Sequence, residues 1–228
     1  MAKKQSSNVD TWLERETKHN REAFESASRY FDGNDSLTVN TLEAIYGQES
    51  SFGLSSKIGV RGSSGAAGHF QFEAATAKRY GLTVSKNNDQ RFDIDYASSA
   101  AARYLKDLDT SFSKNTTLSG NLKTVGVKNA SEREKFILGA FNAGEGNVAK
   151  AQASAEKAGK NPQLWADVEK YLADETKQYI LKVLSYQTEF GLKSPANKKI
   201  KQKEPRKEYR CTEGHWVTID DHPVFICD

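Results

Sequence analysis

Up to residue 194 the chain shows almost no pattern typical of a β-strand, whereas apolar residues recur at helical spacing in one segment after another. The clearest case is the alanine-rich stretch 96–108, which reads YASSAAARYLKDL. Alanine, leucine, lysine and glutamate are plentiful and only four prolines occur, a composition that favours helices. The sequence therefore predicts a mainly α-helical fold.

Other segments share this spacing, and clusters of glycine, serine and asparagine separate them. Helices are expected at 9–31 (one helix or a pair), 42–50, 70–80 with Gly81 at the C-cap, 131–141 after a capping box at 131–134, 147–158 and 174–190. A loop is expected at 53–68, and a long loop or a helix-poor insertion at 113–129. With 228 residues the chain is long enough for one domain of about 150–200 residues with tails.

The last part of the chain changes character. Residues 195–210 are strongly basic and predict a linker. Two apolar runs at 216–219 and 224–226 flank a short polar turn, which is typical of a β-hairpin. We therefore expect a small hairpin tail over residues 211–228.

Cys211 and Cys227 bracket this hairpin and are the two cysteines of the chain. A disulfide would join them in an oxidising compartment. With His215 and His222 they also form an irregular set of zinc-ligand types. Free thiols are the third alternative, and the sequence leaves all three open.

Charge and hydropathy limit the functional classes. The net charge of +3 suits a polyanionic target but is no signature of nucleic-acid binding. No run of about 18 apolar residues predicts a membrane span. Lys3 and Lys4 are not followed by an apolar stretch, so no secretory signal is expected.

Glu49 is the first candidate for chemistry. It follows an apolar helical stripe that carries Ile45 and Tyr46, and it precedes a loop rich in glycine and serine. A helix end beside a loop can form the wall of a cleft, and a partly apolar pocket raises the pKa of a carboxyl group towards neutral pH. Such an acid can protonate a glycosidic oxygen. By position alone, a solvated surface glutamate is the commoner alternative.

Several short motifs follow one another in a fixed order. They are ESSF at 49–52, GAAGHFQ at 65–71, ATAKRYGL at 75–82, DQRFD at 89–93, AARYL at 101–105, AFNAGEGNV at 140–148 and ETKQYI at 175–180. The ordered set resembles the soluble lytic transglycosylase domain of glycoside hydrolase family 23, and most of all its membrane-bound lytic transglycosylase D group. The resemblance implies a lysozyme-like helical catalytic domain with a glycan groove at 36–194, preceded by a helical extension at 1–35.

The resemblance also assigns roles to residues. Glu49 matches the family's single catalytic acid/base, and Ser50 its neighbour at the start of the active-site loop. Gln71 matches a groove amide that binds the N-acetyl sugar, and Tyr179 a tyrosine that points towards the glutamate. The expected substrate is the glycan strand of peptidoglycan, with no cofactor and no metal.

At two places the sequence departs from the family's pattern. His69 and Phe70 replace a leucine–methionine pair, although Phe70 keeps an apolar groove wall. Phe141 stands before Asn142 where the family usually has tyrosine, so the ring remains and the hydroxyl is lost. Both Phe141 and Asn142 are expected to contact the glycan.

The implied reaction cleaves the MurNAc-(β1,4)-GlcNAc bond and closes a 1,6-anhydro ring on MurNAc. One alternative is a hydrolytic goose-type muramidase that uses Glu73 as a second carboxylate. An alternative of another class is an inactive wall-binding or virion structural protein.

The two sequence segments of the hairpin, GHWVTI and PVFI, are similar to a short terminal segment of phage-encoded particle proteins. Together with the missing secretory signal, this similarity favours a virion-associated enzyme or an endolysin. We therefore expect delivery to the periplasmic cell wall by a phage particle or lysis system. The tail is expected to dock to a partner protein or to form a dimer.

Overall fold

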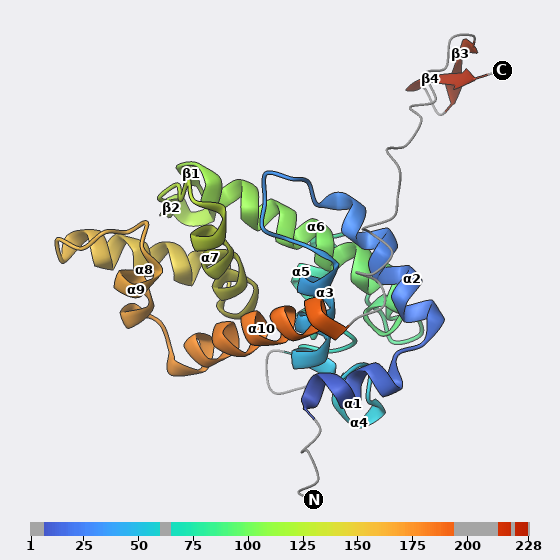
Figure 1. Cartoon of the computed structure of the whole chain (residues 1–228). Helices are drawn as coiled ribbons and strands as arrows, with labels where there is room; N and C mark the ends of the chain where they lie inside the picture. Colours follow the sequence, from blue (N-terminus) through green and yellow to red (C-terminus); the bar gives the residue numbers. More distant parts are fainter. Residues whose placement is uncertain (1–6, 60–64, 194–213, 220–221, 228) are drawn as a thin grey trace, which may run out of the picture. The chain divides into compact units, whose positions relative to one another are not determined.

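The structure, a computed structural model, describes residues 7–59, 65–193, 214–219 and 222–227. Contacts divide the chain into two units, 1–196 and 197–228. The longer helices of the first unit are α1 (Asn8–Arg15), α2 (Lys18–Ala27), α3 (Val39–Ser50), α6 (Ile94–Ser113), α7 (Ala130–Ala143), α8 (Glu145–Lys157) and α10 (Asp174–Lys193) (Figure 1). Short elements complete it: α4 (Ser55–Ile58), α5 (Ala74–Arg79), α9 (Trp165–Val168), the 3-10 turns η1 (Ser28–Tyr30), η2 (Gln90–Phe92), η3 (Ser119–Asn121) and η4 (Glu169–Tyr171), and the strands β1 (Thr116–Thr117) and β2 (Lys123–Thr124). The predicted mainly α, lysozyme-like fold is confirmed.

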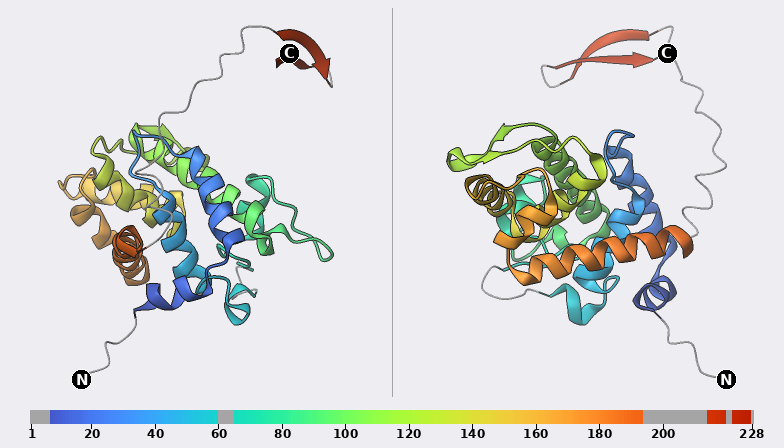
Figure 2. Two further views of the ribbon diagram at one scale, coloured as in Figure 1. Left: turned by 45° about the vertical axis from the view of Figure 1, so that its right-hand side comes forward. Right: turned by 60° about the vertical axis from the view of Figure 1, so that its left-hand side comes forward.

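Helix α3 is the centre of the first unit. Every residue from Thr41 to Gly47 is buried, because other helices cover α3 on all sides. Helix α10 packs along α3, α7 packs against both α6 and α10, and α2 packs against α6 (Figure 2). The largest fully buried side chains include Leu42, Ile45, Tyr46, Leu105, Phe112, Phe136, Ile137 and Leu138. Burial of this size makes α3 a rigid support for the residues at its C-terminal end.

The N-terminal helices are part of this core. The ring of Phe24 lies 5.1 Å from that of Tyr46 on α3, and Trp12 stacks on Phe52 at 6.0 Å. Trp12 also packs directly over Gly47, where a side chain would collide with the indole ring. Helices α1 and α2 therefore confirm the predicted helix pair, and they cover the face of α3 just before Glu49.

Three local expectations were wrong. Residues 70–72 form a turn tied by the bridge between Ala67 and Phe72, so α5 begins only at Ala74. Helix α7 is capped by Asn129, whose Oδ1 accepts from the Glu132 N–H at 2.8 Å, and the box predicted at 131–134 does not form. The expected loop 53–68 contains the short helix α4. The segment 113–129, expected as a long loop or a helix-poor insertion, contains the antiparallel pair β1–β2.

The second unit is an antiparallel hairpin of β3 (Gly214–Ile219) and β4 (His222–Cys227), with Trp216 opposite Phe225. The predicted hairpin is thus confirmed. Cys211 and the linker 195–210 lie outside the described residues, and so do the side chains needed to judge a disulfide or a zinc site. In the described part of the chain, no helix has both the length and the apolar character needed to cross a bilayer.

Candidate active site

A cleft of about 540 Å³ opens where the C-terminal ends of α3 and α7 meet α5 and the first turns of α8 and α10. Six residues singled out by the sequence line it: Glu49, Phe70, Gln71, Glu73, Phe141 and Asn142. The rest of its lining is Ala66, Phe72, Thr76, Arg79, Tyr104, Ala143, Gly144, Glu145 and Glu175. The fold thus brings together side chains that lie as far as 126 residues apart, at Glu49 and Glu175.

Glu49 is half-buried in the last turn of α3, and Ser50 sets the backbone that follows it. The fully buried Ser50 hydroxyl donates to the carbonyl of Tyr46 at 2.9 Å and accepts from the N–H of Gly53 at 3.1 Å. Ser51, Phe52 and Gly53 all have positive φ, a conformation that costs energy at the two non-glycine positions. Ser50 therefore holds a tight left-handed turn directly after Glu49, and it does not line the cleft.

Tyr179 of α10 interacts with Glu49. Its side chain is 5% exposed, and the pKa of its phenol is raised well above 10.0, first by burial and then by the charge of Glu49 and a hydrogen-bonding interaction with it. No strict hydrogen-bond geometry joins the hydroxyl to a partner, so the contact with Glu49 is a loose one. Contacts of this kind often tighten when a substrate binds. The phenol is neutral and able to donate to the Glu49 carboxylate.

The turn that carries Phe70 and Gln71 also lines the cleft. Phe70 belongs to the aromatic core, with its ring 5.7 Å from Tyr46, and borders the cleft. Gln71 has a φ of 48°, and its Nε2 donates to the carbonyl of Gly68 at 2.8 Å. Its Oε1 is buried and has no hydrogen-bond partner among the described residues. Gln71 thus has a fixed amide with one unsatisfied acceptor in the wall of the cleft.

Arg91 stabilises this turn through hydrogen bonds. Its buried guanidinium donates from Nη1 to the carbonyls of Gly65 at 2.8 Å and Phe72 at 2.9 Å, and from Nη2 to Asp89 at 2.7 Å. At Gly68, a Cβ would collide with the Arg91 carbonyl. The close approach permitted by Gly68 and the carbonyls bound by Arg91 fix the position of Gln71.

The remaining predicted residues come from α7 and α5. The Phe141 ring lies 5.8 Å from Phe72 and 5.4 Å from Tyr104, and Asn142 follows it before Gly144 ends the helix with a φ of 86°. Glu73 occupies the N-cap position of α5 and is exposed on the cleft rim. Both sets therefore line the cleft, from α7 and from the start of α5.

A polar group at one end of the cleft was not singled out from the sequence. Arg79 Nη1 donates to Glu145 Oε1 at 3.0 Å, and the Tyr104 hydroxyl donates to Glu145 Oε2 at 3.1 Å. Burial alone would raise the pKa of Glu145, but bonds from its own N–H, Arg79 and Tyr104 lower it below 4.5. Arg79 and Glu145 both lie inside the recognised motifs, but their pairing across 66 residues leaves no mark in local spacing.

Within the described ranges, no cluster of three or more histidine, cysteine, aspartate or glutamate side chains could hold a metal ion.

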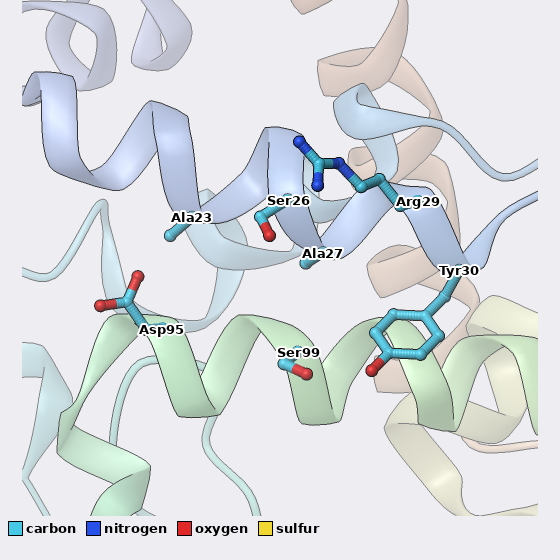
Figure 3. A pocket seen from close by; sticks show the side chains of 7 residues that line it. All are labelled: Ala23, Ser26, Ala27, Arg29, Tyr30, Asp95 and Ser99. Atoms are coloured by element: carbon cyan, nitrogen blue, oxygen red, sulfur yellow. The ribbon is translucent and has the colours of Figure 1, made fainter. Parts of the chain in front are cut away.

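A separate hollow of about 320 Å³ lies between α2 and α6, bordered by Ala23, Ser26, Ala27, Arg29, Tyr30, Asp95 and Ser99 (Figure 3). It shares no residue with the cleft, and small side chains form much of its floor. We therefore place the candidate chemistry in the cleft.

Part of the chain is similar to known proteins. Residues 28–164, more than half of the chain, match the family described as transglycosylase SLT domain. Over 120 residues the chain is 30% identical to the membrane-bound lytic murein transglycosylase D of Escherichia coli (strain K12) and, equally, to that of Escherichia coli O6:H1. The aligned part is 53% of this chain but 22% of each relative.

Proposed function

The chain belongs to the transglycosylase SLT domain family, and on that premise we propose that it is a peptidoglycan lytic transglycosylase. The observation that carries the proposal is the position of Glu49, at the end of a buried helix, in a cleft and facing the neutral phenol of Tyr179. The names of the aligned relatives support the same activity. The bond cleaved is MurNAc-(β1,4)-GlcNAc, and the product carries a 1,6-anhydro ring.

Glu49 acts twice in the proposed reaction. Its protonated carboxyl group gives a proton to the bridging oxygen as the bond from the anomeric carbon of MurNAc breaks, and the 2-acetamido oxygen of the same sugar stabilises that carbon. The carboxylate then takes the proton of the 6-hydroxyl, whose oxygen bonds to the anomeric carbon. Because no water is consumed, one carboxylate is enough, whereas ordinary glycosidases use two.

The other cleft residues bind and orient the strand. Gln71 Oε1 is a buried acceptor without a partner among the described residues, and after a shift of the side chain it accepts from the N–H of an N-acetyl group. The ring of Phe141 gives apolar contact to sugar faces, and the Asn142 amide bonds to hydroxyl groups. Phe70 is 1% exposed and supports this wall from within the core. Ser50 contributes indirectly, through the turn that orients Glu49.

The test is mass spectrometry of the soluble products that the chain and its Glu49→Gln variant release from purified sacculi. We expect 1,6-anhydro-MurNAc ends with the unchanged chain and about a thousandfold less product with the variant, which keeps the shape of Glu49 but cannot transfer its proton. Glu25→Gln is the matched control, because Glu25 is an exposed glutamate of α2 outside the cleft lining. No product with the unchanged chain would favour the inactive wall-binding or virion structural alternative.

The second candidate function is hydrolysis with Glu73 as the base for water. The observation that favours it is that Glu73 lines the same cleft as Glu49 and is open to solvent. Digestion in isotopically labelled water separates the two reactions, since hydrolysis places solvent oxygen on a reducing MurNAc end. Labelled ends that disappear in Glu73→Gln would establish the hydrolase.

Delivery by a phage particle or lysis system, with the hairpin β3–β4 docked to a partner protein, is the finer part of the proposal. It rests on the hairpin's sequence alone. Mass spectrometry of purified particles from a producing strain tests it, because a virion-associated enzyme remains with the particle through purification.

A further inference from the structure

The turn that carries Gln71 also contains His69, a residue that the proposed reaction does not use. The backbone N–H of His69 donates to the carbonyl of Arg91 at 2.9 Å, and its ring nitrogen Nε2 lies 2.9 Å from the carbonyl oxygen of Phe92. Because a carbonyl only accepts, Nε2 carries the proton of the neutral ring. Two hydrogen bonds therefore tie His69 to η2, one from the backbone and one from the side chain.

The imidazole ring of His69 also contacts α3 close to its C-terminal end. Its centroid lies 5.5 Å from that of the Tyr46 ring, one helical turn before Glu49. A Cβ at Gly53 would collide with the Tyr46 hydroxyl and would lie 3.5 Å from His69 Cε1. Gly53 belongs to the left-handed turn that follows Glu49. His69 thus connects the turn of Gln71 with the part of the chain that supports Glu49.

The second ring nitrogen of His69 makes this connection sensitive to pH. Nδ1 is buried and has no hydrogen-bond partner among the described residues. In the neutral ring it carries only a lone pair, whereas protonation places an N–H and a positive charge there. A buried donor without an acceptor is costly, and a buried charge is more so. To bring Nδ1 to water the ring has to turn, which breaks the bond from Nε2 to Phe92.

The charged groups around the ring do not offset this cost. Burial lowers the pKa of His69 below 6.5, and it outweighs the backbone hydrogen bond and the charge of Asp93, which both raise it. Tyr46 of α3 faces the ring as a neutral phenol, because burial raises its pKa above the usual value. The Arg91 guanidinium is held in an ion pair of its own, and residues 51–53 carry no charge.

We propose that His69 is a positioning residue whose neutral ring keeps Gln71 aligned with Glu49 in the cleft, so that glycan binding weakens when the ring is protonated. This inference rests on the proposed function and deepens it. The backbone bond to Arg91 and the bonds of its guanidinium remain, so protonation loosens the turn without unfolding it. The leucine that His69 replaces in the family's pattern cannot titrate, so the pH response belongs to this chain.

An NMR titration of the full chain from about pH 8 to about pH 5 tests the connection without turnover. The protein carries Glu49→Gln, so that Glu49 does not titrate in the cleft. We expect the side-chain amide signals of Gln71 to move with the same midpoint as the His69 ring, below pH 6.5. His69→Gln keeps a donor for the carbonyl of Phe92 but does not titrate, and it should abolish this movement.

His19→Gln is the matched control for the titration. His19 is a histidine of α2 whose side chain is 63% exposed, and it does not line the cleft. The variant should leave the movement of the Gln71 signals unchanged. Gln71 signals that stay fixed while the His69 ring titrates would overturn the inference.

Binding of a labelled, peptide-free glycan strand of alternating GlcNAc and MurNAc to the same proteins measures the consequence. We expect the affinity to fall about tenfold from the neutral to the acid end of the range, the equivalent of one hydrogen bond, and this fall should be absent in His69→Gln. His69→Leu lacks the donor and should bind more weakly at both ends.

An acid loss of affinity that persists in His69→Gln, or an affinity that does not change with pH in the parent protein, would overturn the inference. Failure of the proposed function looks different. If the Gln71 signals move with His69 but no glycan binds at any pH, the positioning of Gln71 by His69 is supported and the proposed function alone is contradicted.

Discussion

Glu134 and Glu145 lie eleven residues apart on consecutive helices, and both are half-buried, yet their pKa values move in opposite directions. Burial, helped by the negative charge of Asp35, raises the pKa of Glu134 to about 7. Its Oε1 accepts from Gln187 Nε2 at 2.9 Å, a neutral partner. At Glu145 burial acts in the same direction, but its own N–H, Arg79 and Tyr104 outweigh it.

The difference shows that burial alone drives a carboxyl group towards its neutral form, and that a nearby cation with good donors reverses the effect. It also shows that a shifted pKa does not by itself mark a functional position. Glu134 has the pKa expected of a glycosidase acid, but it is not among the residues that line the cleft. The choice of a catalytic residue therefore has to start from its position in the cleft. Glu49 lines the cleft.

The largest expected effect concerns the stability linked to Glu134. Because the folded-state pKa is raised from 4.5 to about 7, the folded protein binds more protons than the unfolded chain between these values. The stability linked to Glu134 is present below pH 4.5 and is lost as the pH rises through about 7. Glu134→Gln removes this loss and should stabilise the protein by on the order of 2 kcal/mol above pH 7.

Urea unfolding below pH 4.5 and above pH 7 measures this change. Glu25→Gln, at an exposed position of α2, is the control that should change neither value. A Glu134→Gln protein that is no more stable than the unchanged chain at the higher pH would mean that Glu134 titrates like an exposed glutamate.

The next effect concerns the interaction of Tyr179 with Glu49. Tyr179→Phe keeps the buried ring but removes the hydroxyl that interacts with Glu49. We expect a fall in kcat of about tenfold with little change in KM, because a hydrogen bond to a charged group is worth about 1.5 kcal/mol. Release of anhydro products measures it, and Tyr171→Phe, at an exposed tyrosine, is the control. Unchanged kcat would remove Tyr179 from the site.

A smaller effect is expected where Glu145 loses its cation. Arg79→Ala should lower stability by about 0.5 kcal/mol at neutral pH, a small value because the Arg79 side chain is 51% exposed. Since the pKa of Glu145 is lowered, this contribution is present above pH 4.5 and lost as the pH falls through the folded-state value. Thermal unfolding at neutral and acid pH should therefore show a difference only at neutral pH. Arg79→Lys keeps the charge and should retain part of it.

The smallest effect concerns Asp35, the second cause of the raised pKa of Glu134. Asp35→Asn removes a negative charge, so the pKa of Glu134 should fall but stay above 4.5, because burial remains. An NMR titration of labelled glutamate carboxyl groups follows it directly. Asp174→Asn, at an exposed aspartate, should leave it unchanged. A Glu134 pKa that does not move would assign the whole shift to burial.

Sequence patterns predicted the helices well but not their first residues. At α7, both Asn129 and Ser131 are good capping residues, and Asn129 takes the role. The buried Arg133 explains the choice, because it bonds to Asp109 on α6 at 2.6 Å and to the carbonyl of Val127 at 2.9 Å. These contacts set where the chain can enter the helix, and none of them is visible in the local pattern.

The turn at Phe70 and Gln71 is a similar case. Its apolar residues fit a helix, but the buried guanidinium of Arg91, about twenty residues later, binds the carbonyls on either side and stabilises a turn. Local propensity is worth at most about 1 kcal/mol per residue, so a few buried hydrogen bonds to a charged group outweigh it. The same reason explains why the Arg79–Glu145 pair was not predicted.

What the sequence by itself determined is therefore the helical class, the order of the helices, the terminal hairpin and the motifs whose residues line one cleft. These follow from spacing along the chain, because helical periodicity is a local property. Only the tertiary structure decided which residues face one another: Tyr179 behind Glu49, Arg79 on Glu145, Arg91 under Gln71 and Gln152 under the β1–β2 hairpin. Each of these contacts joins residues far apart in the chain, and their energy exists only when the whole core is packed.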